Sequence, residues 1–479
     1  MIPHFPALRL GKPYESLDKT DLTPLNSEEP IAQISQVNAG IIRRDYRKIG
    51  VATAALESFS TDKLIEISAE AGRIFMNETL PVGDTGATQD PDEYIRTLSS
   101  TTGLPYSLCR FNVQKIEHVI TNLTTIIKGL TRGLPTKIFD EHIIQVDGID
   151  VCYFPAADSV GTVLPSNAPA VNSLWAPAIA MKVPVILKPG REDPWTPFRL
   201  IQAYIAAGAP PEAFGFYPTD HEGSDTILNT CSRGIVFGGD ETVSKYASNP
   251  NISCHGTGRS KVLIGEDMVE NWPELIDTIA TSISANSGRS CICASTVITP
   301  RYGDEIAQAL AEKLSEIQPL SPDDDNARLS GFANPAMAEW IDSKVEEGLA
   351  EGGARDISAP LRNDAPRKTE QFGQNFLHPT IVRCDNIEHS LARTEFLFPY
   401  AGVVEMPQDD MLENIGPSLV ISAITEDRPW IGKLLRSKDI DRLNTGLMPT
   451  CHVQWEQPHE GNLFEFLYHR RAIQRAVGN

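Results

Sequence analysis

The chain has 479 residues, too many for a single hydrophobic core, so two or three domains are expected. Its apolar fraction of 41% and charged fraction of 22% are those of a globular protein and exclude a disordered chain. The formal net charge of -21 argues against nonspecific binding to nucleic acid or to anionic membranes, although local positive charge can still hold a small anion.

The N-terminus has neither a basic start nor an apolar stretch typical of a secretory signal, and no apolar run is long enough to cross a bilayer. Most of the eight cysteines stand singly in apolar runs. Only Cys291 and Cys293 are close neighbours, and they lack the second pair that a zinc site needs. We therefore expect a cytoplasmic protein with reduced thiols and no metal site.

The first part of the chain is predicted to be helical. Apolar residues recur at helical spacing over residues 61–75, 92–99 and 113–130. The pattern changes near residue 142, where residues 142–152 predict a β-hairpin with Asp147-Gly148 at its turn.

From residue 158 onward, short apolar runs alternate with helical patterns. Strands are predicted at 160–164, 183–187, 214–217, 234–237 and 261–264, and helices at 173–181 and 198–207. A second set follows, with helices at 272–286, 304–317 and 335–349 and strands at 291–299, 376–382 and 402–406. This alternation predicts doubly wound α/β sheets.

A small-residue loop, Asn286-Ser287-Gly288-Arg289-Ser290-Cys291, leads from a predicted helix into a predicted strand. Such a loop lets the thiol stand clear of the core beside backbone N–H groups, which favour the reactive thiolate. Taken alone, the segment favours the alternative of a buried cysteine at the start of a strand.

Polar residues follow two of the buried strands. Asn167, between Pro165 and Pro169, either donates its amide to an oxyanion or caps the next helix. Lys188 ends a strand at the edge where α/β sheets bind ligands, and Arg191, three residues later, favours an anion site over a merely solvated lysine.

Two further segments have weaker patterns. Gly238-Gly239-Asp240 ends a strand before a helix, where glycines let the backbone approach a pyrophosphate, but the segment lacks the G-x-G-x-x-G fingerprint. Glu395 stands among aromatic residues before Pro399, where it either accepts hydrogen bonds from ribose hydroxyls or faces solvent.

Together, the order and spacing of these segments resemble the aldehyde dehydrogenase superfamily. The shared signature is Pro-x-Asn-x-Pro, Leu-Lys-Pro, Phe-x-Gly, Asn-x-Gly-x-x-Cys and Glu-x-x-x-Pro, over about residues 155–410. The resemblance implies an α/β fold with a Rossmann-like cofactor domain, an α/β catalytic domain and a small β oligomerisation arm. The C-terminal tail, with Trp455 and Phe464, matches the family poorly and forms either a substrate wall or a subunit interface.

The resemblance also implies roles for the matching residues. Cys291 would be the nucleophile that adds to the substrate carbonyl, and Asn167 with the backbone N–H of Cys291 would stabilise the oxyanion. NADP or NAD would exchange a hydride with the covalent adduct on Cys291, and this step would interconvert the adduct and a thioester. The residues assigned to the cofactor are Lys188 and Glu395 for the riboses, Gly239 and Asp240 under the pyrophosphate, and Leu397 beside the nicotinamide ribose.

Three positions depart from the family pattern. His255 replaces the glutamate that activates water in hydrolytic members. Either His255 is the base that activates water, or coenzyme A accepts the acyl group, as in acyl-CoA reductases. A further alternative is that His255 is a loop residue without a catalytic role. Arg289 replaces a glutamine and either favours the Cys291 thiolate or pairs with a local acid. Arg191 stands where NAD-preferring members often have Glu, which favours NADP, although Glu192 follows directly.

We therefore predict a cofactor domain at 1–255, completed by part of 441–479, and a catalytic domain at 256–440. The hairpin at 142–152 and the C-terminal tail would form the arm of a homodimer or homotetramer. The predicted reaction is the NAD(P)-dependent interconversion of an aldehyde and an acyl-level product. The alternative from another class is a catalytically silent scaffold, which would show neither NAD(P) binding nor preferential alkylation of Cys291.

Overall fold

The structure is a computed structural model that describes residues 2–363 and 365–474. The chain divides into two compact units. The first comprises Met1–Thr101, Cys109–His255 and Gln454–Asn479, and the second comprises Thr102–Leu108 and Gly256–Val453. None of the described helices combines the length and the apolar character needed to span a membrane.

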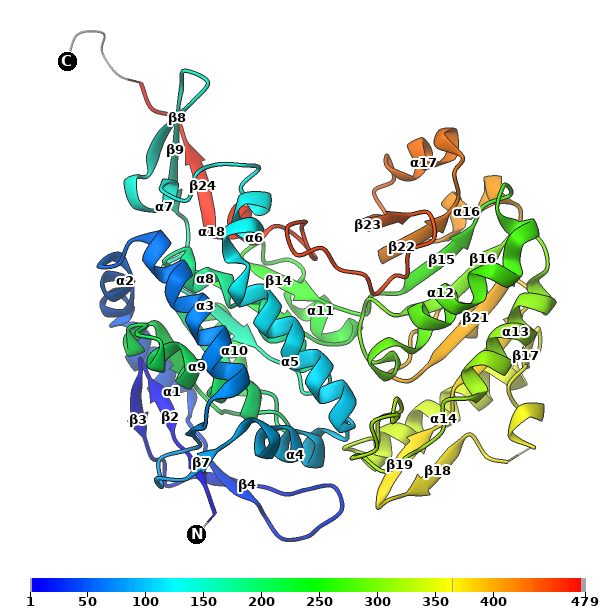
Figure 1. Ribbon diagram of the computed structural model, residues 1–479, viewed down its shortest axis with the longest axis horizontal. Helices are drawn as coiled ribbons and strands as arrows, with labels where there is room; N and C mark the ends of the chain where they lie inside the picture. Colours follow the sequence, from blue (N-terminus) through cyan, green and yellow to red (C-terminus); the bar gives the residue numbers. More distant parts are fainter. Residues whose placement is uncertain (1, 364, 475–479) are drawn as a thin grey trace. The chain divides into compact units, whose positions relative to one another are not determined.

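The first unit is built on a seven-stranded sheet with the strand order β14-β13-β10-β11-β12-β2-β3. Figure 1 labels β2, β3 and β14 of this sheet. The five strands β10 to β14 are parallel to one another. At the edge opposite β14, β2 and β3 are antiparallel to their neighbours. The bounds are β2 Ala7–Arg9, β3 Lys12–Tyr14, β10 Val160–Val163, β11 Val185–Lys188, β12 Phe214–Phe216, β13 Arg233–Phe237 and β14 Ile252–His255.

The parallel strands form where short apolar runs were predicted, because strands covered on both faces need apolar side chains throughout. β10 lies between β11 and β13, so the strand order reverses direction at β10. Right-handed crossovers then place α8 (Pro177–Ala180) and α9 (Trp195–Ala206) on one face of the sheet and α10 (His221–Thr230) and α11 (Asp240–Tyr246) on the other. In such sheets, ligands bind at the carboxyl ends of the strands beside this reversal.

Helices and short strands of the N-terminal region complete the first unit. A small sheet has the order β1-β5-β4, and β6 pairs with β7. The remaining bounds are β1 His4–Phe5, β4 Lys19–Leu22, β5 Ala32–Ser35, α1 Ala39–Tyr46, α2 Ile49–Glu57, α3 Thr61–Asn77, β6 Leu80–Pro81, β7 Thr88–Gln89, α4 Pro91–Thr102, α5 Tyr106–Thr121, α6 Leu123–Leu130 and α7 Ile138–Glu141. The helices predicted at 61–75, 92–99 and 113–130 are confirmed as α3, α4, and α5 with α6. The short strands of this region were not predicted, because strands of two to four residues are too short to show a period-2 pattern.

The predicted hairpin is confirmed as β8 (Ile143–Val146) and β9 (Ile149–Pro155). Asp147 and Gly148 have φ of 49° and 79°, the positive values that a two-residue turn of type I′ requires. The C-terminal strand β24 (Tyr468–Arg471, red in Figure 1) pairs with β9 to form a three-stranded sheet. Helix α18 (Leu463–Leu467) leads into β24.

The second unit also contains a seven-stranded sheet, with the order β17-β20-β21-β16-β15-β22-β23. All neighbours are parallel except β17 and β20. The strand bounds are β15 Ser260–Ile264, β16 Ala294–Thr299, β17 Ala354–Asp356, β20 Thr380–Cys384, β21 Tyr400–Glu405, β22 Ser418–Ile424 and β23 Ile440–Thr445, with a separate hairpin of β18 Lys368–Gln371 and β19 Gln374–Leu377.

Alternating side chains of this sheet enter two hydrophobic clusters. Val262 and Ile264 pack with helices α12 (Trp272–Ser284) and α13 (Gly303–Ser315), whereas Leu263 packs with the cluster formed by the other helices. Period-2 alternation therefore gives the sheet an apolar layer on each face. The helices of the second layer are α14 Pro335–Ala350, α15 Ser390–Arg393, α16 Gln408–Asn414 and α17 Arg428–Leu434.

Three predicted elements have different bounds. Residues 173–181 form no continuous helix but a 3-10 helix, Pro169–Leu174, followed by the four-residue α8. The predicted strand at 376–382 is two strands, β19 and β20. The strand expected from Cys291 begins only at Ala294, because residues 291–293 form a turn in which Cys293 N–H donates to the Ser290 carbonyl over 2.8 Å.

Candidate functional site

Four predicted site residues of the first unit lie where its parallel strands end. Asn167 follows β10, Lys188 is the last residue of β11, Gly239 follows β13, and His255 is the last residue of β14. Because parallel strands end at one edge of a sheet, these residues share the edge at which doubly wound sheets bind ligands. The strand register pairs Val163 with Lys188 and Phe237 with His255.

The loops after β10 and β11 are packed closely together. A Cβ at Gly190 would collide with the Ser166 side chain and the Pro165 carbonyl, and the Ser166 hydroxyl accepts a hydrogen bond from the Glu192 N–H over 3.1 Å. Partial burial lowers the pKa of Lys188, while the nearby Glu192 carboxylate opposes this shift. A partly buried ammonium forms stronger hydrogen bonds to a ribose hydroxyl or a phosphate than a fully solvated one does. Arg191 is exposed beside it.

Gly239 caps helix α11, and Asp240 is the first residue of that helix. Both are exposed, and nothing lies within 4 Å of a Cβ built on Gly239. Open backbone at this position leaves room for a pyrophosphate close to the main chain. Together with the ammonium of Lys188, this edge has the donors and the open backbone that a dinucleotide cofactor needs.

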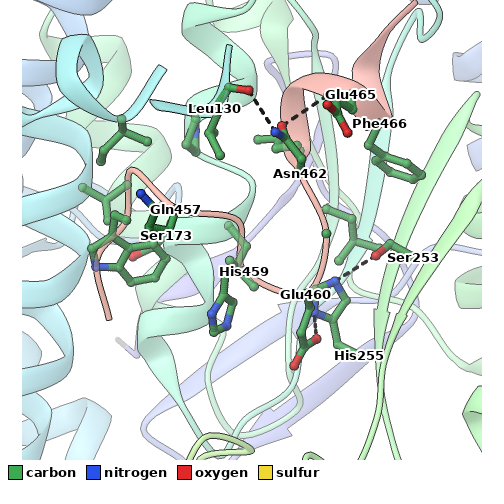
Figure 2. A pocket seen from close by; sticks show the side chains of 18 residues that line it. Leu130, Ser173, Ser253, His255, Gln457, His459, Glu460, Asn462, Glu465 and Phe466 are labelled. Atoms are coloured by element: carbon green, nitrogen blue, oxygen red, sulfur yellow. Dashed lines mark hydrogen bonds and ion pairs between the residues drawn. The ribbon is translucent and has the colours of Figure 1, made fainter. Parts of the chain in front are cut away.

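His255 is a strand residue and not the loop residue that the sequence allowed. Its Nδ1 forms an ion pair with Glu460, and its Nε2 lies 3.1 Å from the Ser253 hydroxyl (Figure 2). The side chain is buried, with 7% exposure. Both ring nitrogens are therefore engaged by groups of the first unit. The sequence singled out neither Ser253 nor Glu460, because one belongs to an unpredicted strand and the other lies more than 200 residues away in the chain.

In the second unit, a strained loop presents Cys291. Asn286, Ser287 and Gly288 have consecutive φ values of 48°, 59° and 66°. Left-handed backbone is costly for residues with a Cβ and persists where the surroundings hold it. The Ser287 hydroxyl accepts a hydrogen bond from Ser330 N–H over 2.9 Å, and a Cβ at Gly288 would collide with the Phe398 carbonyl.

Cys291 differs from Cys293 in its accessibility. Cys291 is partly exposed and packs beside Leu419 and Val420, whereas Cys293 is 5% exposed and its thiol points at the Ala285 carbonyl, 3.1 Å away. The Ser260 hydroxyl donates to the Cys291 carbonyl over 2.8 Å, which fixes the backbone at Cys291. A reactive thiol must reach its substrate, so the structure favours Cys291 over Cys293.

Arg289 contacts a backbone carbonyl and an aromatic ring of the second unit. Its guanidinium is buried, donates to the Gly331 carbonyl over 2.6 Å, and stacks on the Phe332 ring with the two centres 4.9 Å apart. Burial lowers the pKa of Arg289 to about 10. These contacts fix the Cys291 loop to the segment around Gly331.

Glu395 lies before β21, and its carboxylate accepts a hydrogen bond from Arg259 N–H over 2.6 Å. Burial raises the pKa of Glu395 to about 7. Lys261, which the sequence analysis did not single out, donates to the Arg259 carbonyl over 2.6 Å and to the Ser418 hydroxyl over 2.7 Å, and burial lowers its pKa to about 8. Leu397 is partly buried against the core cluster of the same unit.

The raised pKa of Glu395 predicts a pH-dependent stability. The folded carboxyl holds its proton up to about pH 7, whereas its ordinary pKa is 4.5, so the folded state binds more protons between these values. Stability from this group is present below pH 4.5 and is lost as the pH rises through 7. In the absence of nucleotide, Glu395→Gln should raise the free energy of unfolding at pH 8 by up to about 3 kcal/mol and change it little at pH 5. Urea unfolding at both pH values measures the difference, and a pH-independent difference would contradict the shift.

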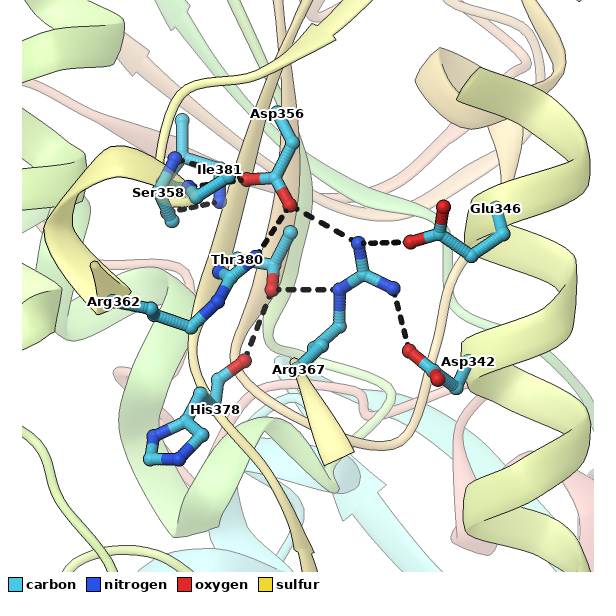
Figure 3. Close-up of polar contacts among 10 residues, drawn as sticks. Asp342, Glu346, Asp356, Ser358, Arg362, Arg367, His378, Thr380 and Ile381 are labelled. Atoms are coloured by element: carbon cyan, nitrogen blue, oxygen red, sulfur yellow. Dashed lines mark hydrogen bonds and ion pairs between the residues drawn. The ribbon is translucent and has the colours of Figure 1, made fainter. Parts of the chain in front are cut away.

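The second unit also contains a buried ionic network, which is formed by residues other than those discussed so far (Figure 3). The Arg367 guanidinium, 2% exposed, donates to Asp342 over 2.6 Å, to Asp356 over 3.0 Å and to Glu346 over 3.1 Å. Asp356 also accepts from Arg362 over 2.7 Å. The network joins α14 to the strands β17 and β20, and so supports one end of the sheet.

Comparison with known proteins places this chain in a family. The model described as "Aldehyde dehydrogenase family" matches residues 85–414, which is more than half of the chain, so the chain belongs to the aldehyde dehydrogenase family. This finding confirms the resemblance drawn from the motifs. A malonate-semialdehyde dehydrogenase of Listeria monocytogenes is 24% identical over 331 residues, which is 66% of this chain and 64% of the relative.

Other relatives and solved structures agree with this fold. A geranial dehydrogenase of Castellaniella defragrans is 23% identical over 66% of this chain and 65% of its own length. The aldehyde dehydrogenase KauB from Pseudomonas aeruginosa has a TM-score of 0.80 at 16% identity, covering 99% of this chain and 97% of that one. A 3,6-anhydro-L-galactose dehydrogenase in complex with NAP has a TM-score of 0.78 at 14% identity, covering 98% of this chain and 99% of that one. The predicted α/β architecture is confirmed.

Proposed function

We propose that this chain is an NAD(P)-dependent oxidoreductase that interconverts an aldehyde and an acyl-level product through a covalent bond to Cys291. The observation that carries the proposal is the partly exposed thiol at the end of a loop of consecutive left-handed residues. The family model and the dehydrogenase names of the relatives support a reaction at an aldehyde.

In the proposed reaction, the Cys291 sulfur adds to the carbonyl carbon and a C–S bond forms. The oxygen takes up negative charge, for which the backbone N–H of Cys291 and the amide of Asn167 are the assigned donors. A bound nicotinamide supplies the hydride acceptor or donor. The fixed Cys291 backbone keeps its N–H aimed at one place, so stabilising the oxyanion requires little reorganisation.

The cofactor assignments follow the strand ends of the first unit and the carboxylate of the second. Lys188 and Glu395 bind ribose hydroxyls, and the open backbone at Gly239 and Asp240 accepts the pyrophosphate. The exposed guanidinium of Arg191 favours NADP, because it can bind a 2′-phosphate through two hydrogen bonds. Solved neighbours were crystallised with both cofactors, one with NAP and an indole-3-acetaldehyde dehydrogenase with NAD+.

Within this proposal, the acceptor of the acyl group from Cys291 is either water or coenzyme A. A base for water needs a ring nitrogen that can accept the proton of that water. In His255, Glu460 engages Nδ1 and Ser253 lies at Nε2, which favours coenzyme A over water as the acceptor. The relatives' names do not distinguish the two.

A panel of aldehydes with NAD+ or NADP+, with and without coenzyme A, tests the proposal. We expect reduced nicotinamide to form, with a lower KM for NADP+ than for NAD+. Coenzyme A should raise turnover at least about tenfold and yield an acyl-CoA, because a thiol attacks a thioester readily. Turnover unchanged by coenzyme A, with free acid as product, would assign water as the acceptor. No turnover with any aldehyde, together with no nucleotide binding, would favour the silent scaffold.

We also infer that β8, β9 and β24 form the arm of a homo-oligomer. Ile149 in β9 is 62% exposed and Ile473, just after β24, is 39% exposed. Exposed aliphatic side chains beside open strand edges favour pairing with another chain.

A further inference from the structure

A cavity of about 320 Å³ lies within the first unit (Figure 2). Helices α5 and α6, the segment 173–177, strands β13 and β14 and the segment 455–466 line it. One part of its wall is aliphatic and aromatic, formed by Val119, Ile126, Leu130, Leu174, Ile235 and Phe466. Ser253, His255 and Glu460 line the same cavity. Its volume is at the lower end of the ~300–1,000 Å³ typical of small-molecule sites.

Ser253, His255 and Glu460 form a continuous polar chain at this cavity. Ser253 and His255 are alternate residues of the edge strand β14, so their side chains lie on one face. The Ser253 hydroxyl lies 3.1 Å from His255 Nε2, and the Glu460 carboxylate pairs with Nδ1. The Phe237 ring packs on the imidazole with the ring centres 4.8 Å apart, which fixes the ring plane.

The backbone that carries Glu460 is strained. Glu460 and Gly461 have φ of 48° and 101°, and the glutamate has a Cβ that normally excludes this conformation. The next residue, Asn462, caps helix α18 and donates to the Leu130 carbonyl over 2.9 Å, which anchors the segment to the cavity wall. Strained backbone held by its surroundings is a recurrent feature of functional sites.

The order of the three groups has a chemical meaning. A carboxylate at Nδ1 favours the tautomer that carries its proton on Nδ1 and leaves a lone pair on Nε2. That lone pair faces the Ser253 hydroxyl, so the proton that His255 is placed to accept belongs to a serine. This is the arrangement by which a histidine base activates a serine nucleophile, with the carboxylate orienting the ring and stabilising its cation.

We propose that Ser253, His255 and Glu460 form a second acyl-transfer centre that hydrolyses esters or thioesters of short, uncharged apolar acyl groups. The aliphatic wall suits an apolar acyl chain, and the carboxylates of Glu460 and Glu465 at the cavity disfavour an anionic one. This activity requires neither a nicotinamide nor Cys291, so it is independent of the proposed oxidoreductase.

The reaction balances without a redox step. The Ser253 oxygen bonds to the acyl carbon as its proton passes to His255 Nε2, and the bond to the alcohol or thiol breaks as that group leaves with the proton. In the acyl-enzyme the Ser253 oxygen carries no proton and no longer donates to Nε2, so a water can take that place. The water attacks the acyl carbon and gives a proton to Nε2, which passes it to the Ser253 oxygen as the acid leaves. The net reaction converts ester and water into acid and alcohol.

The test measures hydrolysis of 4-nitrophenyl butyrate by the full chain carrying Cys291→Ser, without nicotinamide. This background removes any contribution from the cysteine. We expect hydrolysis to persist, and to fall about 100-fold or more when Ser253→Ala, His255→Ala or Glu460→Gln is added. Ser248→Ala and Glu456→Gln, which replace nearby residues outside the cavity, should leave the rate within about twofold.

A fluorophosphonate probe gives a readout that does not depend on the folding of a variant. In the unsubstituted protein it should label Ser253, located by mass spectrometry of the peptide. Hydrolysis that disappears with Cys291→Ser alone, full-rate hydrolysis by Ser253→Ala, or absence of the Ser253 adduct would overturn the proposal. These outcomes leave aldehyde oxidation untouched, so the two functions fail separately.

Discussion

Cys291→Ser should reduce nicotinamide-dependent turnover of aldehydes by about 1,000-fold or more, because a serine hydroxyl is a far weaker nucleophile than a thiolate and no base is assigned to it. The left-handed loop and the hydrogen bond to the Cys291 carbonyl hold the backbone in either variant. The exchange changes one atom of a partly exposed side chain, so the fold should persist. Absorbance of the reduced nicotinamide, followed in the single variant, measures the loss.

Cys293→Ser is the matched control, because it makes the same exchange two residues away. Its thiol is buried and points at the Ala285 carbonyl, so turnover should remain within about threefold of the unsubstituted protein. Iodoacetamide should alkylate Cys291 before Cys293, in line with their exposure. Equal loss of turnover in both variants, or full turnover by Cys291→Ser, would remove Cys291 from the role of nucleophile.

The parts of the fold that the sequence predicted well are those determined by local pattern. Strands β10, β11 and β13 lie within a few residues of the predicted runs, because buried parallel strands need continuous apolar residues and end at polar ones. The Asp147-Gly148 turn was predictable for a similar reason, since both residues tolerate positive φ.

The parts that were missed depend on contacts between distant segments. Strand β14 was not predicted, because its alternation of apolar and polar residues runs over only four residues, Ile252–His255. The partner of His255 is Glu460, which arrives from the C-terminal segment, and no spacing rule joins residues so far apart. The Cys291 loop was predicted as a site, but its strand begins three residues later because the turn at Ser290 delays it.

The two units also differ in where their candidate residues lie. In the first unit they follow the carboxyl ends of strands, as the rule for doubly wound sheets predicts. In the second unit Cys291 and Glu395 precede β16 and β21, at the amino ends of parallel strands. Strand-end rules would not have selected these two residues, whereas the family motifs did. Motif spacing and sheet geometry therefore contributed different parts of the site.

Arg367→Ala should lower the free energy of unfolding of the second unit by about 3–5 kcal/mol, because it removes a buried cation that the buried Asp356 and the partly buried Asp342 share. Among the residues that the structure describes, Asp356 would keep only Arg362 as a cationic partner, at 7% side-chain exposure (Figure 3). Thr380 would lose the donor that lies 3.2 Å from its hydroxyl. Arg367→Lys restores the charge but cannot make the forked contacts, so its loss should be intermediate.

Lys368→Ala is the neighbouring control, because that lysine pairs with Glu339 at the surface, where ion pairs contribute about 0–1 kcal/mol. Since a chain of two units need not unfold in one step, amide hydrogen exchange of residues 335–384 measures the local effect more directly than a single melting curve. Exchange in this segment should accelerate in Arg367→Ala and stay near its original rate in Lys368→Ala. Equal acceleration in both variants would mean that the buried ion pairs of Arg367 stabilise the unit no more than a surface ion pair does. That result would contradict the electrostatic argument for Arg367.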